Sequence, residues 1–217
     1  NEEFIHSLLA RASAADTTEA LSTELRLSRQ RLMLLLAYRD LAGLASLSEV
    51  THGISLFAEK AIEISCEAIR RDLKGSVGEP LNANGEYSPM IVVGMGKLGG
   101  QELNVSSDID LVFIYEEEGE TQGGIRSISH HEWYARLGKR LIGLLSEVTA
   151  EGFVFRVDMR LRPNGDSGPL VCSLGMLEEY FSAQGREWER YAWIKGRMVY
   201  PAKTNALTVR MAKSLND

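Results

Sequence analysis

Cysteine is scarce in this sequence, which contains only Cys66 and Cys172 in 217 residues. Two cysteines cannot supply the set of disulfides that stabilises small secreted domains, so we expect a reduced, cytoplasmic setting. Long hydrophobic segments are also lacking. The longest apolar run, Leu32–Tyr38, is far shorter than the roughly 20 residues that a membrane-spanning helix needs. No stretch resembles a signal peptide, and we expect no membrane partner.

Positive charge is not in excess either. The 30 aspartate and glutamate residues outnumber the 24 lysine and arginine residues, and the net charge is −6. This balance argues against binding of nucleic acid over a broad basic face, so we expect no nucleic-acid partner. It does not exclude a nucleotide that is bound through a metal ion. A length of 217 residues fits one domain, or one and a half.

Changes in periodicity divide the chain into four regions. Apolar residues recur at helical spacing in residues 1–74, which predicts an N-terminal helical region with a capping box at Ser46 and Glu49. Residues 75–88 are rich in Gly, Asn and Pro and predict a linker. Residues 89–172 carry the strand patterns of a core, and residues 173–217 are predicted to be helical again. Because the chain begins without Met inside a helical pattern, we expect a fragment of a larger enzyme.

The core opens with Pro89–Tyr115, which predicts a strand, a glycine-rich turn with a short helix, and a second strand. The glycines let the backbone turn tightly and approach a ligand closely. Asp108 and Asp110 begin the second strand two residues apart, so they point to the same face. Like charges this close repel each other, and a bound divalent cation is the usual remedy.

A third carboxylate comes from Phe153–Arg162, whose alternation predicts a strand along the whole stretch. Phe153 and every second residue after it are predicted to face the core. The opposite face carries Asp158 among three arginines. A solvated outer face would explain that pattern, but Asp158 is also the natural third partner for Asp108 and Asp110.

The glycine motif is open to three interpretations. The G-x-G-x-x-G spacing from Gly94 matches a dinucleotide site, but the aspartates follow after about ten residues, too early for a full crossover helix. A Walker P-loop needs Ser or Thr after Gly-Lys, and Leu98 stands there instead. The third is the pair Gly99-Gly100 on a short helix whose N-terminal amides can hold phosphate. Followed by D-x-D and a later aspartate, this order is typical of nucleotidyltransferases.

Three segments of the chain, GMGKLGGQELNVSSDIDLVF, RVDMRLRPNGDSGPLV and REWERYAWIKGRMV, resemble the glutamine synthetase adenylyltransferase family, also called glutamate–ammonia-ligase adenylyltransferase. The front helices are similar to the family too, so the resemblance covers nearly the whole chain. It implies an α+β nucleotidyltransferase fold, with a mixed β-sheet core, flanking helices and an N-terminal helical region. The family has two similar nucleotidyltransferase domains, and one set of motifs is present here.

The resemblance implies that Asp108, Asp110 and Asp158 are catalytic and hold two Mg²⁺ ions. It also implies a set of residues that bind phosphate or nucleotide: Lys97, Gly99, Gly100, Ser107, Arg160 and Arg162. The two glycines and the serine match the family's phosphate-holding positions. The lysine departs from the simplest form of the superfamily, and the individual arginine roles are our own interpretation: one of them would neutralise the second anion.

The segments SSDIDL and GDSGPLV look more like the N-terminal, adenylyl-removing half of the family. The implied reaction is phosphorolysis, in which inorganic phosphate removes AMP from a tyrosine of adenylylated glutamine synthetase and releases ADP. Two alternatives stay open: the ATP-dependent adenylylating half, and a non-catalytic regulatory module that binds nucleotide and a PII-type signalling protein. The implied partners are therefore glutamine synthetase, a PII-type protein, phosphate and ADP, AMP or ATP, in the control of nitrogen metabolism.

Overall fold

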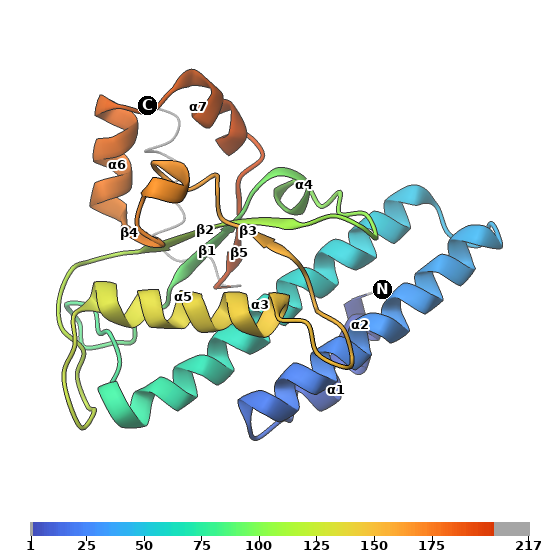
Figure 1. The fold of residues 1–217 in the computed structure, drawn as a ribbon, viewed down its shortest axis with the longest axis horizontal. Coiled ribbons are helices and arrows are strands. Elements are labelled where there is room, and N and C mark those ends of the chain that lie inside the picture. Colours follow the sequence, from blue (N-terminus) through green and yellow to red (C-terminus); the bar gives the residue numbers. More distant parts are fainter. Residues whose placement is uncertain (1, 202–217) are drawn as a thin grey trace.

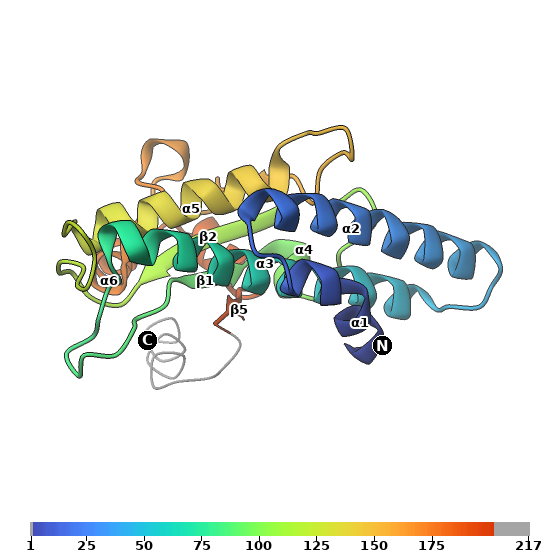
Figure 2. The same ribbon diagram turned by 90° about the horizontal axis from the view of Figure 1, so that it is seen from below.

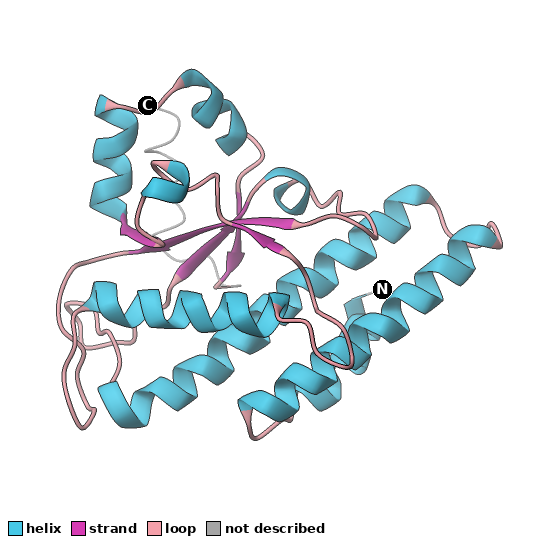
Figure 3. Ribbon diagram, viewed as in Figure 1, coloured by secondary structure: helices cyan, strands magenta, loops and turns pink. Residues whose placement is uncertain are grey.

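The computed structural model describes residues 2–201. A small β-sheet lies at the centre, and helices pack against both of its faces (Figure 1; Figure 3). No helix within this part of the chain is both long and apolar enough to cross a membrane. In chain order the elements are α1 (Glu2–Ser13), α2 (Thr18–Leu41), α3 (Leu47–Val77), β1 (Ile91–Gly94), α4 (Gly96–Gly99), β2 (Ile109–Tyr115), α5 (His130–Ser146), β3 (Val157–Asp158), the 3-10 helix η1 (Gly165–Ser167), β4 (Val171–Ser173), α6 (Leu174–Ala183), α7 (Glu187–Trp193) and β5 (Arg197–Tyr200).

The front of the chain is helical, as predicted, and its helices begin at hydroxyl caps. The Ser46 side chain accepts the N–H of Glu49 at 3.2 Å, which confirms the predicted start of α3. Thr17 caps α2 in the same way, through the N–H of Ala20. Figure 2 shows α2 and α3 running alongside each other past the end of the sheet. α3 contacts α1, α2, α5 and β5, so it is buried along much of its length.

The sheet is built around β2, which has neighbours on both edges. β1 pairs antiparallel with one edge, and β5 pairs antiparallel with the far side of β1. β3 and β4 both pair parallel with the other edge, β3 beside the first residues of β2 and β4 beside the last three. The result is a mixed sheet with flanking helices, as expected for an α+β protein.

The alternation along β2 assigns each side chain to one of two cores. Leu111, Phe113 and Tyr115 belong to the large core that α3 and α5 complete. Val112 and Ile114 face the smaller core that α6 and α7 cover. Because Asp110 lies on the same side of the strand as Val112 and Ile114, it lies on the face that α6 and α7 partly cover.

The predicted strand over Phe153–Arg162 is wrong in its extent, because only Val157 and Asp158 form strand structure. The N–H groups of Val154 and Phe155 both donate to the carbonyl oxygen of Leu145 at 2.9 Å. The chain thus wraps around the end of α5, and both side chains are buried although they are adjacent. After Asp158 the backbone turns, with the N–H of Arg162 donating to Met159.

The predicted helical region at the end of the chain also needs correction. α6 and α7 are present, but Arg197–Tyr200 form the strand β5 on the free edge of β1. The aromatic spacing of the preceding helix favoured a continued helix, whereas the pairing of Val92 and Val93 with β5 comes from a segment about 100 residues away in sequence. The prediction for residues 202–217 lies outside the described residues.

Gly99 lies where the α4 turn packs against the segment that leads into β5, so a substitution there tests this packing. A Cβ on Gly99 would collide with the carbonyl oxygen of Lys195 and stand 2.6 Å from that of Gly94. We expect Gly99→Ala to lower the free energy of unfolding in urea by about 1–3 kcal/mol. Gly143→Ala in α5 is the matched control, since its Cβ meets nothing within 4 Å, and it should raise stability by about 0.5–1 kcal/mol. A Gly99→Ala protein as stable as wild type would contradict the packing.

Candidate functional site

Asp110 and Asp158 lie side by side on adjacent strands. The parallel pairing of β2 with β3 matches Ile109 to Val157 and Asp110 to Asp158. Residues that are directly paired in a sheet project their side chains to the same face. The sequence predicted that these two aspartates meet, and the register places them as neighbours even though β3 contains only two residues.

Asp108 stands at the rim of the same cluster and is held by Arg156. The Nε of Arg156 donates to Oδ1 of Asp108 at 2.5 Å, and its Nη2 donates to the carbonyl oxygen of Ser106 at 2.8 Å. The carbonyl oxygen of Arg156 accepts the N–H of Ile109. Arg156 was not among the predicted site residues. Its place next to Asp158 in an arginine-rich stretch was the signal that could have indicated it.

The cluster contains one carboxylate that is destabilised and one that is well compensated. Burial raises the pKa of Asp110 above its ordinary value, and the neighbouring carboxylates of Asp158 and Asp108 raise it further. Arg160 lowers the pKa of Asp158, because its guanidinium donates to both carboxylate oxygens, at 2.5 to 3.1 Å, and its backbone N–H donates to Oδ1.

The glycine turn brings backbone against Asp110. Gly96 has φ +51°, and a Cβ there would lie 2.9 Å from Oδ2 of Asp110. The N–H of Met95 donates to the carbonyl oxygen of Asp110 at 2.9 Å, which ties the turn to β2. The predicted residues Gly99 and Gly100 lie one turn further on. Their N–H groups donate to Met95 and Gly96 inside the turn, so Gly96 is the glycine whose Cα faces the carboxylate.

The other predicted residues separate into two groups. Lys97 is exposed and close enough to Asp110 to lower the pKa of that carboxyl. Arg160 is also exposed. By contrast, Ser107 donates its hydroxyl to the side chain of Asn104 at 2.8 Å and closes the loop before β2. Arg162 donates to the carbonyl oxygens of Met159, Asp166 and Gly168, so it holds the turn after β3.

Arg197 on β5 fixes the end of the α4 turn. Its Nε donates to the carbonyl oxygen of Gly99 at 3.0 Å and its Nη2 to that of Leu98 at 3.1 Å. The same Nη2 lies 2.5 Å from a carboxylate oxygen of Glu59 on α3. From the sequence we expected Trp193, Lys195 and Arg197 to serve in packing, because the periodicity of this segment did not reveal the strand β5.

The donor set suits a divalent cation, although arginines hold two of the carboxylates. Within residues 2–201, no three Asp, Glu, His or Cys side chains already stand in an arrangement that could hold a metal ion. Two of the carboxylates are engaged in ion pairs, Asp108 with Arg156 and Asp158 with Arg160. Asp110 lacks such a cation and has a raised pKa. Mg²⁺ prefers oxygen ligands such as carboxylates and keeps several waters, so Asp108, Asp110 and Asp158 are the residues that would hold it.

The family model and the relatives found by comparison with known proteins agree on one family. The family model described as glutamate-ammonia ligase adenylyltransferase matches residues 2–213. A relative from Ralstonia nicotianae is 58% identical over 192 residues, covering 88% of this chain and 20% of the relative. One from Burkholderia mallei is 56% identical over 213 residues, covering 98% of this chain and 23% of the relative. Both are named bifunctional glutamine synthetase adenylyltransferase/adenylyl-removing enzyme. The chain thus spans about a fifth of the length of these curated relatives.

The raised pKa of Asp110 predicts a stabilising substitution. Below the ordinary aspartate pKa of about 3.9, Asp110 is protonated in both the folded and the unfolded state. As the pH rises through the raised pKa, ionisation costs the folded state more than the unfolded state, so stability falls. Asp110→Asn should therefore raise the free energy of unfolding at pH 7 in EDTA, and the gain should vanish towards pH 3. Asp158→Asn should instead lower stability at pH 7, because the pKa of Asp158 is lowered by Arg160. A less stable Asp110→Asn protein at pH 7 would contradict the electrostatics.

Proposed function

Because the chain belongs to the glutamate–ammonia ligase adenylyltransferase family, we propose that the carboxylate cluster is a nucleotidyl-transfer centre on a nucleotidyltransferase fold. The reaction is the phosphorolytic removal of AMP from a tyrosine of adenylylated glutamine synthetase. The observation that carries the proposal is the pairing of Asp110 with Asp158 across parallel strands, beside a glycine turn that contacts Asp110. The choice of glutamine synthetase as the protein substrate follows from the names of the relatives.

The fold assignment is supported by how the sheet places the chemistry. A glycine turn connects β1 to β2, the D-x-D pair stands at the start of β2, and the third aspartate is on the adjacent parallel strand. This order presents three carboxylates and one backbone turn at a single edge. A dinucleotide-binding fold would require a parallel neighbour after the glycine turn, whereas β1 and β2 are antiparallel.

Asp108, Asp110 and Asp158 would hold the two Mg²⁺ ions. When bound, these ions would stabilise negative charge on the entering phosphate oxygen and on the leaving tyrosine oxygen. The chain's own cations act on the reactants: Arg160, freed from Asp158, binds the entering phosphate, and Lys97, on the other side of Asp110, binds the phosphoryl oxygens of the AMP group. Together they offset the repulsion between two anions that must come into contact.

In the chemical step, an oxygen of inorganic phosphate forms a bond to the phosphorus of the AMP group. The bond between that phosphorus and the tyrosine oxygen breaks, and its electron pair stays on the tyrosine. The tyrosine oxygen takes up the proton that the attacking phosphate gives up. The products are ADP and unmodified tyrosine, so atoms and charge balance without a further reactant.

The second candidate is ATP-dependent adenylylation of the same tyrosine. The relatives carry both activities in their names, and the chain spans about a fifth of their length. The segments SSDIDL and GDSGPLV favour the removing half. Both reactions use the same carboxylates and the same phosphorus, so they differ only in which group enters and which group leaves.

Asp108→Asn and Asp110→Asn test the centre. In the full-length protein we expect each variant to lower phosphate-dependent ADP release from adenylylated glutamine synthetase by about 100-fold or more, because each removes a carboxylate that would hold Mg²⁺. Circular dichroism should show an unchanged fold. Asp40→Asn, an exposed carboxylate on α2, is the control and should keep wild-type activity. Near-normal release from either site variant counts against the mechanism and favours a binding module.

The direction of the reaction can be separated with labelled substrates. We expect label to move from inorganic phosphate into ADP when adenylylated glutamine synthetase is present. We expect no transfer of labelled AMP from ATP to the unmodified protein by this centre, tested with the other half inactivated. Transfer from ATP that depends on Asp110 would assign the chain to the adenylylating half.

A further inference from the structure

A broad hollow lies between the start of α3 and the loop that follows α4. Its volume is about 870 Å³. Figure 1 shows the two elements that form it, with the first turns of α3 next to the loop after α4. α3 contributes Leu47, Thr51 and His52, and the α4 segment contributes Lys97, Gln101 and Asn104. The resemblance implies a phosphate- or nucleotide-binding role for Lys97 and Gly100, which border the hollow on the α4 side, but neither it nor the proposed mechanism gives a role to the other residues that line it.

The hollow borders the reacting centre through the α4 turn. Lys97 lines it and is also the cation that acts on Asp110 from this side. The adjacent residue, Gly96, has its Cα against Oδ2 of Asp110. A molecule seated in the hollow would therefore reach the carboxylates on the α4 side of β2, opposite the edge where β3 brings Arg156 and Arg160.

The α4 side and the β3 side of Asp110 carry different charges, so they suit different ligands. The β3 side carries the exposed guanidinium of Arg160, with Arg156 beside it, and suits an anion. Among the described residues that line the hollow, one lysine and one carboxylate are charged, and the carboxylate of Glu102 is paired with Lys195 at 2.8 Å. The rest are mainly hydroxyl, amide and apolar groups. Such a lining suits the backbone amides and apolar side chains of a polypeptide better than a phosphorylated nucleotide.

Three exposed leucines, here called the leucine rim, precede or begin the α3 side of the hollow along the chain. Leu47 at the start of α3 is 75% exposed, Leu44 in the preceding turn is 57% exposed, and Leu41 at the end of α2 is 88% exposed. Leu47 lines the hollow itself, and exposed apolar side chains beside a hollow favour a protein contact. The rim therefore argues for a macromolecular occupant.

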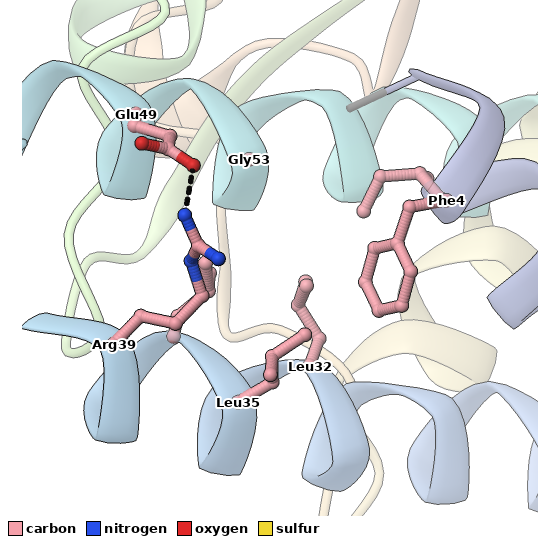
Figure 4. A pocket seen from close by; sticks show the side chains of 8 residues that line it. Phe4, Leu32, Leu35, Arg39, Glu49 and Gly53 are labelled. Atoms are coloured by element: carbon pink, nitrogen blue, oxygen red, sulfur yellow. Dashed lines mark hydrogen bonds and ion pairs between the residues drawn. The ribbon is translucent and has the colours of Figure 1, made fainter. Parts of the chain in front are cut away.

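Another cavity of the helical front differs in kind. It measures about 160 Å³ and lies among α1, α2 and α3, lined by apolar side chains including Phe4, Leu32 and Leu35. Figure 4 shows these side chains together, with the Arg39–Glu49 ion pair at one end. Its lining residues do not overlap with those of the hollow or with the carboxylates. It is a space between packed helices, and we assign it no ligand.

We propose that the hollow and its leucine rim dock the polypeptide that flanks the nucleotidylated tyrosine of the protein substrate. This inference rests on the proposed function. The polypeptide enters from the α4 side and places the tyrosine oxygen at the carboxylates. The attacking phosphate binds on the β3 side, where the exposed arginine stands. The entering phosphate oxygen and the leaving tyrosine oxygen would thus stand on opposite sides of the phosphorus of the AMP group, as an in-line displacement requires.

The experiment measures steady-state kinetics of the full-length protein with adenylylated glutamine synthetase and phosphate. Leu47→Asp and His52→Asp place a negative charge in the hollow without disturbing a buried side chain, because both residues are exposed. We expect each to raise the KM for the protein substrate about tenfold, with kcat at saturation, the KM for phosphate and the Kd for ADP unchanged. Leu34→Asp on α2 is the matched control, since Leu34 is as exposed as Leu47 at 75% and lies outside the hollow.

Each outcome gives a distinct answer. If wild-type protein releases no ADP, the proposed function fails before the hollow is tested. If wild type is active and the two hollow variants keep the KM of Leu34→Asp, the docking inference is overturned. A raised Kd for ADP in the hollow variants also overturns it, because the hollow would then bind the nucleotide.

Discussion

The parallel pairing of β2 with β3 is the constraint on which the proposed chemistry depends. Matching Asp110 to Asp158 brings like charges together, which is unfavourable unless something compensates them. The chain compensates with arginines, and does so unevenly. Asp158 has the bidentate Arg160 and Asp108 has Arg156, whereas Asp110 has only more distant cations and keeps a raised pKa. This imbalance is the basis of our proposal that the cluster binds divalent cations.

Several elements outside the sheet fix this edge. Arg197 binds the carbonyl oxygens at the end of the α4 turn and the carboxylate of Glu59, so β5, α4 and α3 are joined at one side chain. On the other side, the guanidinium of Arg29 on α2 lies 4.9 Å from the ring centroid of Phe153, and that of Arg156 lies 5.8 Å from the same ring. The helical front therefore contacts both flanks of the carboxylates, which gives it a part in positioning the site as well as in forming the core.

The sequence predicted the features that depend on local pattern. The apolar run before Gly94, the alternation from Asp108 and the cap at Ser46 each encode their element within a few residues, and β1, β2 and α3 stand where those signals placed them. The proximity of Asp158 to Asp110 was also predictable. Each was expected to project from one face of a strand in the same small core, so the two could meet if the strands were neighbours. The features that failed depend on distant partners. The Leu145 carbonyl bends the chain at Val154, and the open edge of β1 recruits β5. The roles of Arg162 and Arg197 could not be read from the sequence, since each follows from which acceptor lies within reach.

The central claim is that Asp108, Asp110 and Asp158 together bind divalent cations. Paramagnetic broadening of backbone amide NMR signals during a Mn²⁺ titration tests it most directly, without any substrate. Broadening should appear first at residues 95–97, 108–111 and 156–160, and it should disappear in Asp110→Asn. Broadening centred on the acidic loop at residues 116–120, or broadening that Asp110→Asn leaves unchanged, would contradict the claim.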